Sequence, residues 1–247
     1  MKQFTARHPW AILAAGAAIQ ILTGLPAAWG VFQQPVMDEF SLTEDGAGYA
    51  FGILIAAFGV GCVIGGFLQD KKGPRCAALW GTGLLCGGFF AAALLPGEKG
   101  AWFWAVFSIP AGLGTAFLYP SIQSCAQKWY AGRKGLATGV IGGAVGLSGA
   151  FLTGFVRTAL KGFGPVQGIR WAFWALGVLT LPVCLVGSAL LTDPPPAKQK
   201  PEEQGRGKGT PALDLAPLQM LRTKQYWLCA GAVCGSTPPG RLSSPTT

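Results

Sequence analysis

The stretch GGFLQDKKGPR, residues 65–75, ends one uninterrupted apolar run and precedes another. Its last six residues are one acid, three cations and a Gly-Pro pair: Asp70, Lys71, Lys72, Gly73, Pro74 and Arg75. Glycine adopts backbone angles that other residues avoid, and proline is tolerated at the start of a helix. The stretch therefore predicts a tight polar turn between two long apolar helices.

The apolar runs on both sides of this turn belong to a series. A helix needs about 20 residues to cross the hydrocarbon of a bilayer. Runs of about that length occupy residues 10–32, 46–68, 76–95, 101–124, 135–156 and 170–191. The chain is also only 12% charged, where soluble domains average about 25%. We expect an all-α protein with six transmembrane helices, whose first partner is the lipid bilayer.

The charges between the runs predict an orientation. Cations gather at the N-terminus, in the 65–75 turn, near residues 128–134 and after run six, whereas the connection QQPVMDEFSLTED (33–45) has four acids and no cation. Short cytoplasmic connections are enriched in Lys and Arg. Tryptophans at the run ends, such as Trp10, Trp80 and Trp102, are typical of the membrane interface. The pattern predicts a multi-pass protein of the cell (inner) membrane with a cytoplasmic N-terminus.

The end of the chain predicts three regions. Residues 1–192 form the six-span bundle, and 193–225 form a Pro-, Gly- and charge-rich cytoplasmic linker that cannot bury enough apolar surface to fold alone. Residues 226–247 start a seventh span, which STPPGRLSSPTT (236–247) then interrupts. This aborted span suggests a truncated or frameshifted chain, with a genuine short tail as the alternative.

Several classes of function are disfavoured. The net charge is +9, but the cations form no basic face with interleaved aromatics, so we expect no nucleic-acid partner. The single histidine, His8, precedes the first span, which argues against a Ser-His or Cys-His site and a multi-histidine metal site inside the membrane. The seven cysteines include no C-x-x-C pair. We expect no enzyme, no cofactor and no metal.

A family resemblance follows from the 65–75 turn. Gly66, Asp70, Lys71, Gly73 and Arg75 match the pattern G-x-x-x-D-K-x-G-x-R after the second span, which resembles the signature loop of the major facilitator superfamily. AWGVFQQPVMDEF (28–40), KWYAGRKGLATG (128–139) and MLRTKQYW (220–227) resemble segments of the oxalate/formate antiporter group within it.

The resemblance implies a fold and an activity. The fold is the N-terminal half of a major facilitator, with six helices in two inverted three-helix repeats, followed by a broken seventh span. The activity is secondary transport of a small organic anion, such as a mono- or dicarboxylate, by alternating access. Asp70 and Arg75 would control the cytoplasmic gate, because the family's loop acid contacts a helix of the C-terminal half. The C-terminal half is therefore an implied partner.

Substrate-binding candidates are polar residues within the spans: Tyr119, Gln123 and Gln20. Each of them can alternatively be a hydrogen bond between helices. Oxalate carriers of the group line the cavity with glutamine and aromatic residues, but here Pro26, Ala27 and Val145 occupy such positions and only Tyr119 keeps an aromatic hydroxyl. A monocarboxylate is therefore as compatible as oxalate.

Glycines four residues apart, as at 61/65, 83/87, 135/139/143 and 142/146, predict close packing between helices of the bundle. Because a transport cavity needs two halves, we expect this chain alone to be an inactive N-terminal fragment. The alternative is a half-size, non-transporting or oligomerising membrane subunit.

Overall fold

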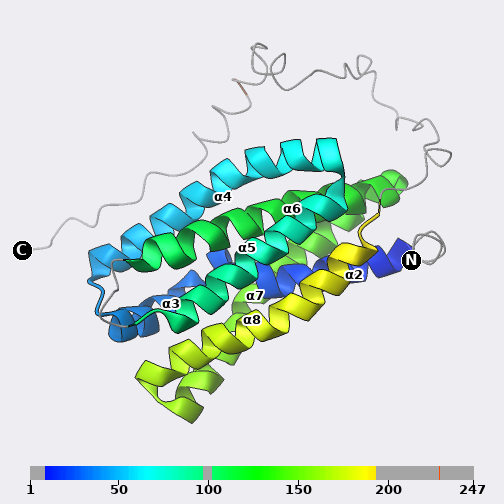
Figure 1. The fold of residues 1–247 in the computed structure, drawn as a ribbon. Coiled ribbons are helices and arrows are strands. Elements are labelled where there is room, and N and C mark those ends of the chain that lie inside the picture. The colour runs from blue at the N-terminus through cyan, green and yellow to red at the C-terminus, as the bar shows by residue number, and fades with distance from the viewer. Residues whose placement is uncertain (1–8, 97–101, 193–227, 229–247) are drawn as a thin grey trace, which may run out of the picture. The chain divides into compact units, whose positions relative to one another are not determined.

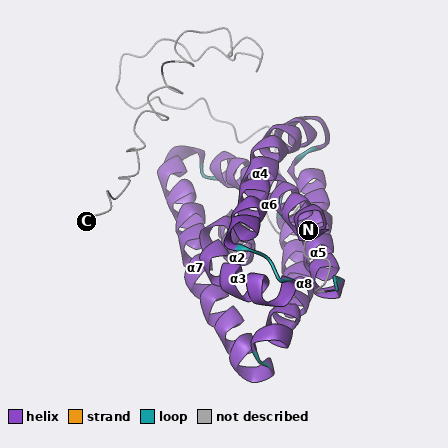
Figure 2. Ribbon diagram, turned by 90° about the vertical axis from the view of Figure 1, so that its left-hand side faces the viewer, coloured by secondary structure: helices purple, strands orange, loops and turns teal. Residues whose placement is uncertain are grey.

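The structure, a computed structural model, describes residues 9–96, 102–192 and 228. The chain divides by internal contacts into Met1–Glu202 and Glu203–Thr247, and the fold below is that of the first unit. Every regular element described there is a helix, and six helical segments are long and apolar enough to cross a membrane (Figures 1 and 2). The all-α, six-span prediction is confirmed. The predicted linker (193–225) and the predicted seventh span (226–247) lie outside the described residues, apart from Leu228.

The spans follow one another in chain order. The first consists of two helices, α2 (Pro9–Thr23) and α3 (Leu25–Phe40). The other elements are α4 (Glu44–Lys72), α5 (Pro74–Leu94), the π-helical turn η2 (Trp104–Ser108) that leads into α6 (Ile109–Trp129), the 3-10 turn η3 (Ala131–Arg133), α7 (Lys134–Phe163) and α8 (Pro165–Leu190). The first three-helix repeat is α2/α3, α4 and α5, and the second is α6, α7 and α8.

The first span is longer than its apolar run, which corrects the predicted bounds of 10–32 and the predicted loop at 33–45. Helix α3 continues to Phe40, and only residues 41–43 separate it from α4. Phe32, Val36 and Phe40 lie four residues apart on one face, and all three are buried. This apolar face holds the polar sequence QQPVMDEF in a helix, even though Pro35 lies inside it.

The two repeats share a turn. Gly73 joins α4 to α5 with φ 86° and ψ 163°, and Gly164 joins α7 to α8 with φ 82° and ψ 169°. In both, the glycine N–H donates to the carbonyl four residues earlier, Gln69 at 2.7 Å and Leu160 at 3.0 Å, and the next helix begins with proline. Only glycine adopts this backbone conformation readily. The predicted tight turn is confirmed, and it occurs twice.

The core is aromatic at one end and glycine-rich along its middle. Phe103, Phe107 and Phe173 form a cluster with ring centroids 5.0 to 6.2 Å apart. Elsewhere glycine lets backbones touch: a Cβ at Gly112 of α6 would lie 2.5 Å from the carbonyl oxygen of Leu54 in α4. Such close approach is the usual role of small residues between membrane helices.

The glycine prediction is right for one span and wrong for two others. Gly61 and Gly65 of α4 pack against Ala116 and Phe117 of α6. A Cβ at any of the following would instead meet nothing within 4 Å among the described atoms: Gly83, Gly87, Gly135, Gly139, Gly142, Gly143 and Gly146. Helix α7 buries only one face against the bundle. Its glycine rows lie on the opposite, exposed face.

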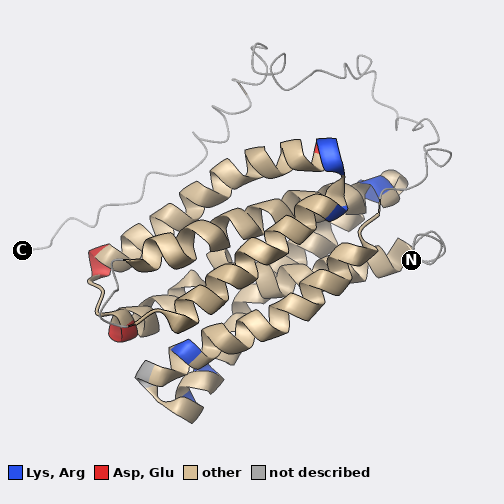
Figure 3. Ribbon diagram, viewed as in Figure 1, with Lys and Arg blue, Asp and Glu red and all other residues tan. Residues whose placement is uncertain are grey.

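Charged residues lie at the ends of the helices and leave the middle of the bundle uncharged (Figure 3). One end, here named the basic end, carries Asp70 and the cations Lys71, Lys72, Arg75, Lys128, Arg133 and Lys134. The opposite end, named the acidic end, carries Asp38, Glu39, Glu44, Asp45, Arg157, Lys161 and Arg170. This distribution agrees with a helix bundle whose middle lies in hydrocarbon.

Candidate functional site

A row of polar side chains runs along α6. Tyr119, Gln123 and Gln127 are four residues apart, so they lie on one face of the helix, and all three are half-buried. The Gln127 amide donates to the Thr138 hydroxyl of α7 at 3.0 Å. The Gln123 side-chain oxygen is buried and accepts no hydrogen bond within the described structure. The row therefore offers hydroxyl and amide groups that are not all used within the described bundle.

Tyr119 stands where α6 is locally weakened. Its ring centroid lies 6.3 Å from that of Phe58 in α4. The next residue, Pro120, lies inside the helix and has no N–H, which leaves the Ala116 carbonyl without its helical donor. An aromatic hydroxyl beside an opened helical turn is suited to contact a small polar solute.

Gln20 lies in a different environment from the α6 row. It is only 1% exposed and sits inside the bundle on α2. Its side-chain oxygen accepts a hydrogen bond from the Thr23 hydroxyl at 3.3 Å, and its amide nitrogen makes no hydrogen bond among the described residues. The structure thus brings Tyr119 and Gln123 together on one face and places Gln20 on another helix, within the bundle interior.

A break in the first span follows Gln20. Helix α2 ends at Thr23 and α3 begins at Leu25, with Gly24 between them. The Ser148 hydroxyl of α7 donates mainly to the Val145 carbonyl of its own helix at 2.6 Å and lies 3.2 Å from the Gly24 carbonyl, and a Cβ on Gly24 would collide with that hydroxyl oxygen. Many transporter sites contain discontinuous membrane helices, whose break leaves backbone carbonyl and N–H groups free to bind a solute.

The signature-loop residues take different positions. Asp70 and Lys71 are exposed in the last turn of α4, and Gly66 faces open space on the same helix. Gly73 ends α4 in the positive-φ turn described above. The Lys71 charge suits a helix C-terminus, whereas that of Asp70 does not. Asp70 forms no ion pair with any other residue of ranges 9–96 and 102–192.

Arg75, in contrast, turns inward. Its Nε donates to the Leu191 carbonyl at 2.6 Å, and a terminal guanidinium nitrogen donates to the Thr192 hydroxyl at 2.6 Å. Leu191 is the C-cap of α8. The Trp129 indole of α6 donates to the Thr192 carbonyl at 2.5 Å. Arg75 therefore ties the start of α5 to the end of α8, next to the end of α6.

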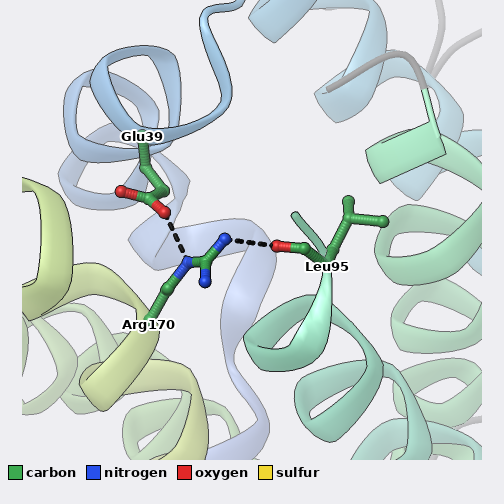
Figure 4. Close-up of polar contacts among 3 residues, drawn as sticks. All are labelled: Glu39, Leu95 and Arg170. Carbon is green, nitrogen blue, oxygen red and sulfur yellow. Dashed lines mark hydrogen bonds and ion pairs between the residues drawn. The ribbon is translucent and has the colours of Figure 1, made fainter. Parts of the chain in front are cut away.

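A second arginine makes a comparable set of contacts at the acidic end (Figure 4). Arg170, near the start of α8, pairs through Nε with the Glu39 carboxylate of α3 and donates through a terminal nitrogen to the Leu95 carbonyl at 2.6 Å. Leu95 is the C-cap of α5. Glu39 is 8% exposed, so its charge is compensated by a specific partner.

Sequence reasoning missed this ion pair. The sequence alone places Glu39 in a connection at 33–45 rather than on a helix. The available signal was the spacing of Glu39 with Phe32, Val36 and Phe40, which places the acid on the buried side of a continuing helix.

Six apolar spans with charge confined to their ends (Figure 3) define the class of a multi-pass membrane protein. The sequence profile of the Major Facilitator Superfamily matches residues 11–238. The chain therefore belongs to this family, which confirms the resemblance seen in the signature loop.

Curated relatives come from distant organisms. The oxalate:formate antiporter of Oxalobacter formigenes is 23% identical over 211 residues, which are 84% of this chain and 47% of the antiporter. The MFS-type transporter YhjX of Escherichia coli is 24% identical over 225 residues, 91% of this chain and 53% of YhjX. A 38 kDa protein of the Thermoproteus tenax 23S RNA operon is 32% identical over 237 residues, 94% of this chain and 56% of that protein. This chain spans about half the length of these relatives.

Proposed function

We propose that this chain supplies one half of a secondary transporter for a small organic anion, working by alternating access. The observation that carries the proposal is the combination of the α6 polar row with the open faces of α4 and α7. A row of hydroxyl and amide groups can bind carboxylate oxygens. An anion in the membrane also needs a positive partner. Helix α6 carries no Lys or Arg before Lys128, which lies with Lys134 at the basic end, so we assign the positive partner of an anion at Tyr119 and Gln123 to a second set of helices.

Tyr119 and Gln123 are the proposed contacts to the anion. Both are half-buried, and the Gln123 oxygen lacks a partner among the described residues. Gln20 remains a proposed contact of lower rank, since it is 1% exposed and the anion could reach it only if the helices around Gly24 moved. One relative is named an oxalate:formate antiporter, and another, 28% identical over 187 residues, is mouse monocarboxylate transporter 9. These names favour a mono- or dicarboxylate.

The orientation belongs to the same proposal. Short cytoplasmic loops carry more Lys and Arg than outer loops. We therefore place the basic end of the bundle, with Lys71, Arg75 and Arg133, in the cytoplasm. Exposed Asp70 then faces the cytoplasmic surface, where a helix N-terminus of the second half would complement its charge.

Uptake of labelled carboxylates by a transporter in which these six spans continue into a second six-span half tests the proposal. The panel contains oxalate, formate, acetate and lactate. One hydrogen bond to a charged group is worth about 1.5–3 kcal/mol, so Tyr119→Phe and Gln123→Leu are each expected to weaken the apparent affinity by about tenfold or more. Val178→Ala, on an exposed face of α8, is the matched control and leaves uptake unchanged. Equal uptake by all three variants would contradict the assignment.

The present chain alone is expected to transport none of these anions when reconstituted into liposomes, because its side of the cavity stays open. Carboxylate exchange by the purified chain would instead favour the second candidate, a half-size subunit that pairs with a copy of itself. The open glycine rows of α7 are compatible with either partner.

A further inference from the structure

Two groups of contacts hold the helix ends of this bundle, one at each end. The basic clamp consists of Arg75, Trp129, Leu191 and Thr192, and the acidic clamp consists of Glu39, Leu95 and Arg170. Each clamp joins three helices through residues that are far apart in the sequence. The two clamps use different residues but connect equivalent helices of the two repeats.

The construction follows the inverted repeat. In the basic clamp, Arg75 starts the third helix of repeat one (α5) and caps the end of the third helix of repeat two (α8). In the acidic clamp, Arg170 lies near the start of α8 and caps the end of α5. The two arginine contacts are therefore equivalent, with α5 and α8 in exchanged roles. The matching turns at Gly73 and Gly164 place both arginines where this is possible.

In each clamp, a residue at the end of a first span is the third member, and these residues are also in equivalent places in the two repeats. Trp129 is the last residue of α6, the first helix of repeat two, and it donates to the Thr192 carbonyl beside Arg75. Glu39 lies next to the last residue of α3, in the first span of repeat one, and it pairs with Arg170. Each clamp thus joins both third helices to the end of one first span. Neither clamp contains a residue of α4 or α7.

From these contacts we propose that Arg75 and Arg170 are a matched pair of positioning residues. They tie the third spans of both repeats to each other at both membrane faces and to one first span at each face, and neither clamp includes a residue of α4 or α7. Arg75 therefore acts on the end of α8 and on Thr192, the residue before the predicted linker, whereas Asp70 is the signature-loop charge that is exposed at the basic end. The proposal does not depend on which anion is carried.

Each arginine holds its target with a charged donor at a helix C-terminus, where carbonyls lack helical partners. The Leu191 N–H donates to the Gly187 carbonyl at 3.1 Å, and the Leu95 N–H donates to the Ala92 carbonyl at 3.3 Å. These two amides therefore report on the last turns of α8 and α5. Loss of a clamp should open only the turn that it caps.

The test is hydrogen–deuterium exchange, followed by mass spectrometry, on the full chain in lipid nanodiscs. Arg75→Ala is expected to speed exchange in the last turn of α8 about tenfold and to leave the last turn of α5 unchanged. Arg170→Ala is expected to do the reverse. A general loss of stability would raise exchange at both ends together, so the one-ended response separates positioning from mere destabilisation.

Matched variants complete the test. Arg133→Ala at the basic end and Arg157→Ala at the acidic end remove exposed arginines and are expected to change neither turn. Arg75→Lys keeps the charge but cannot reach both acceptors with a planar fork, so an intermediate rate is expected. If Arg75→Ala yields no folded protein, Thr192→Ala keeps all charges, removes the hydroxyl that accepts from Arg75 and donates to the Leu190 carbonyl, and is expected to speed exchange at α8 alone, about threefold. If an arginine-to-alanine variant raises exchange equally in the last turns of α5 and α8, or changes neither, the proposal is wrong.

Discussion

Helices α5 and α8 differ from α4 and α7 in how completely the bundle holds them. In their most apolar stretches, 56% of residues are buried in α5 and 39% in α8, against 17% in α4 and 28% in α7. The arginine clamps hold both ends of α5 and α8 and do not touch α4 or α7. The second helix of each repeat therefore turns the larger share of its surface away from the bundle, although α4 packs closely on α6 along its buried face.

The largest expected effect comes from adding bulk against the packed face of α4, and the matched control adds the same bulk to the open face of α7. Gly112→Leu is expected to destabilise the bundle by about 3 kcal/mol or more, because its Cβ would lie 2.5 Å from the Leu54 carbonyl oxygen and 2.9 Å from the Ala57 Cβ. Thermal unfolding in detergent measures the effect. Gly143→Leu, on the open face of α7, is the control and should change stability by less than about 0.5 kcal/mol. A similar loss in both variants would remove the distinction between the two faces.

The acidic clamp gives the next largest effect. Glu39→Gln is expected to cost about 2 kcal/mol, because it leaves the Arg170 guanidinium without its carboxylate. The cost stays below the 3–5 kcal/mol typical of fully buried pairs, since the Arg170 side chain is 35% exposed. Chemical denaturation of the purified chain measures it, with Glu44→Gln, an exposed acid at the same end, as the control. If both variants unfold at the same denaturant concentration, the clamp contributes nothing to stability.

The two matching turns predict matching penalties. Gly73→Ala and Gly164→Ala are each expected to destabilise by about 1–3 kcal/mol, because alanine is strained at φ values of 86° and 82°. Gly66→Ala, in a helical conformation with open space around it, should be neutral or slightly stabilising. Differential scanning fluorimetry of the three variants gives the comparison. Tolerance of alanine at one turn but not at the other would mean that the two turns are not equivalent.

The smallest expected effect is at the glycine row itself. Gly139→Ala should leave the unfolding temperature of this chain unchanged or raise it slightly, because alanine favours a helix by up to about 1 kcal/mol and meets no neighbour at this position. Scanning fluorimetry with Gly61→Ala in parallel supplies the contrast, since a Cβ at Gly61 would lie 2.6 Å from the Ala116 Cβ. A loss at position 139 as large as at position 61 would show that the α7 face is already covered.

The sequence predicted the features that follow from local composition. Apolar run lengths gave the six spans, and the pairing of a glycine with a proline gave the α4–α5 turn. The same turn at Gly164 was overlooked because no charge cluster surrounds it. The continuation of α3 to Phe40 could not be read from run length, since burial of Phe32, Val36 and Phe40 outweighs a polar local sequence.

The candidate site was less predictable than the fold. Tyr119 and Gln123 are candidates from the sequence because hydroxyl and amide groups are rare within apolar runs, and the structure places both on one face of α6. Whether a polar residue faces outward or inward depends on helix rotation, and Gln20 turns into the bundle. The partners of Arg75 and Arg170 include backbone carbonyls more than 70 residues away in sequence. Carbonyl acceptors carry no sequence signal, so only the structure shows these contacts.

The most direct test of the central contrast places leucine at both Gly139 and Gly143. We predict that the six-span chain keeps its unfolding temperature within about 2 °C, and that a transporter extended by a second six-span half loses carboxylate uptake because the open α7 face can no longer receive its partner. Full uptake by the extended variant would show that this face meets only lipid, and would contradict the account.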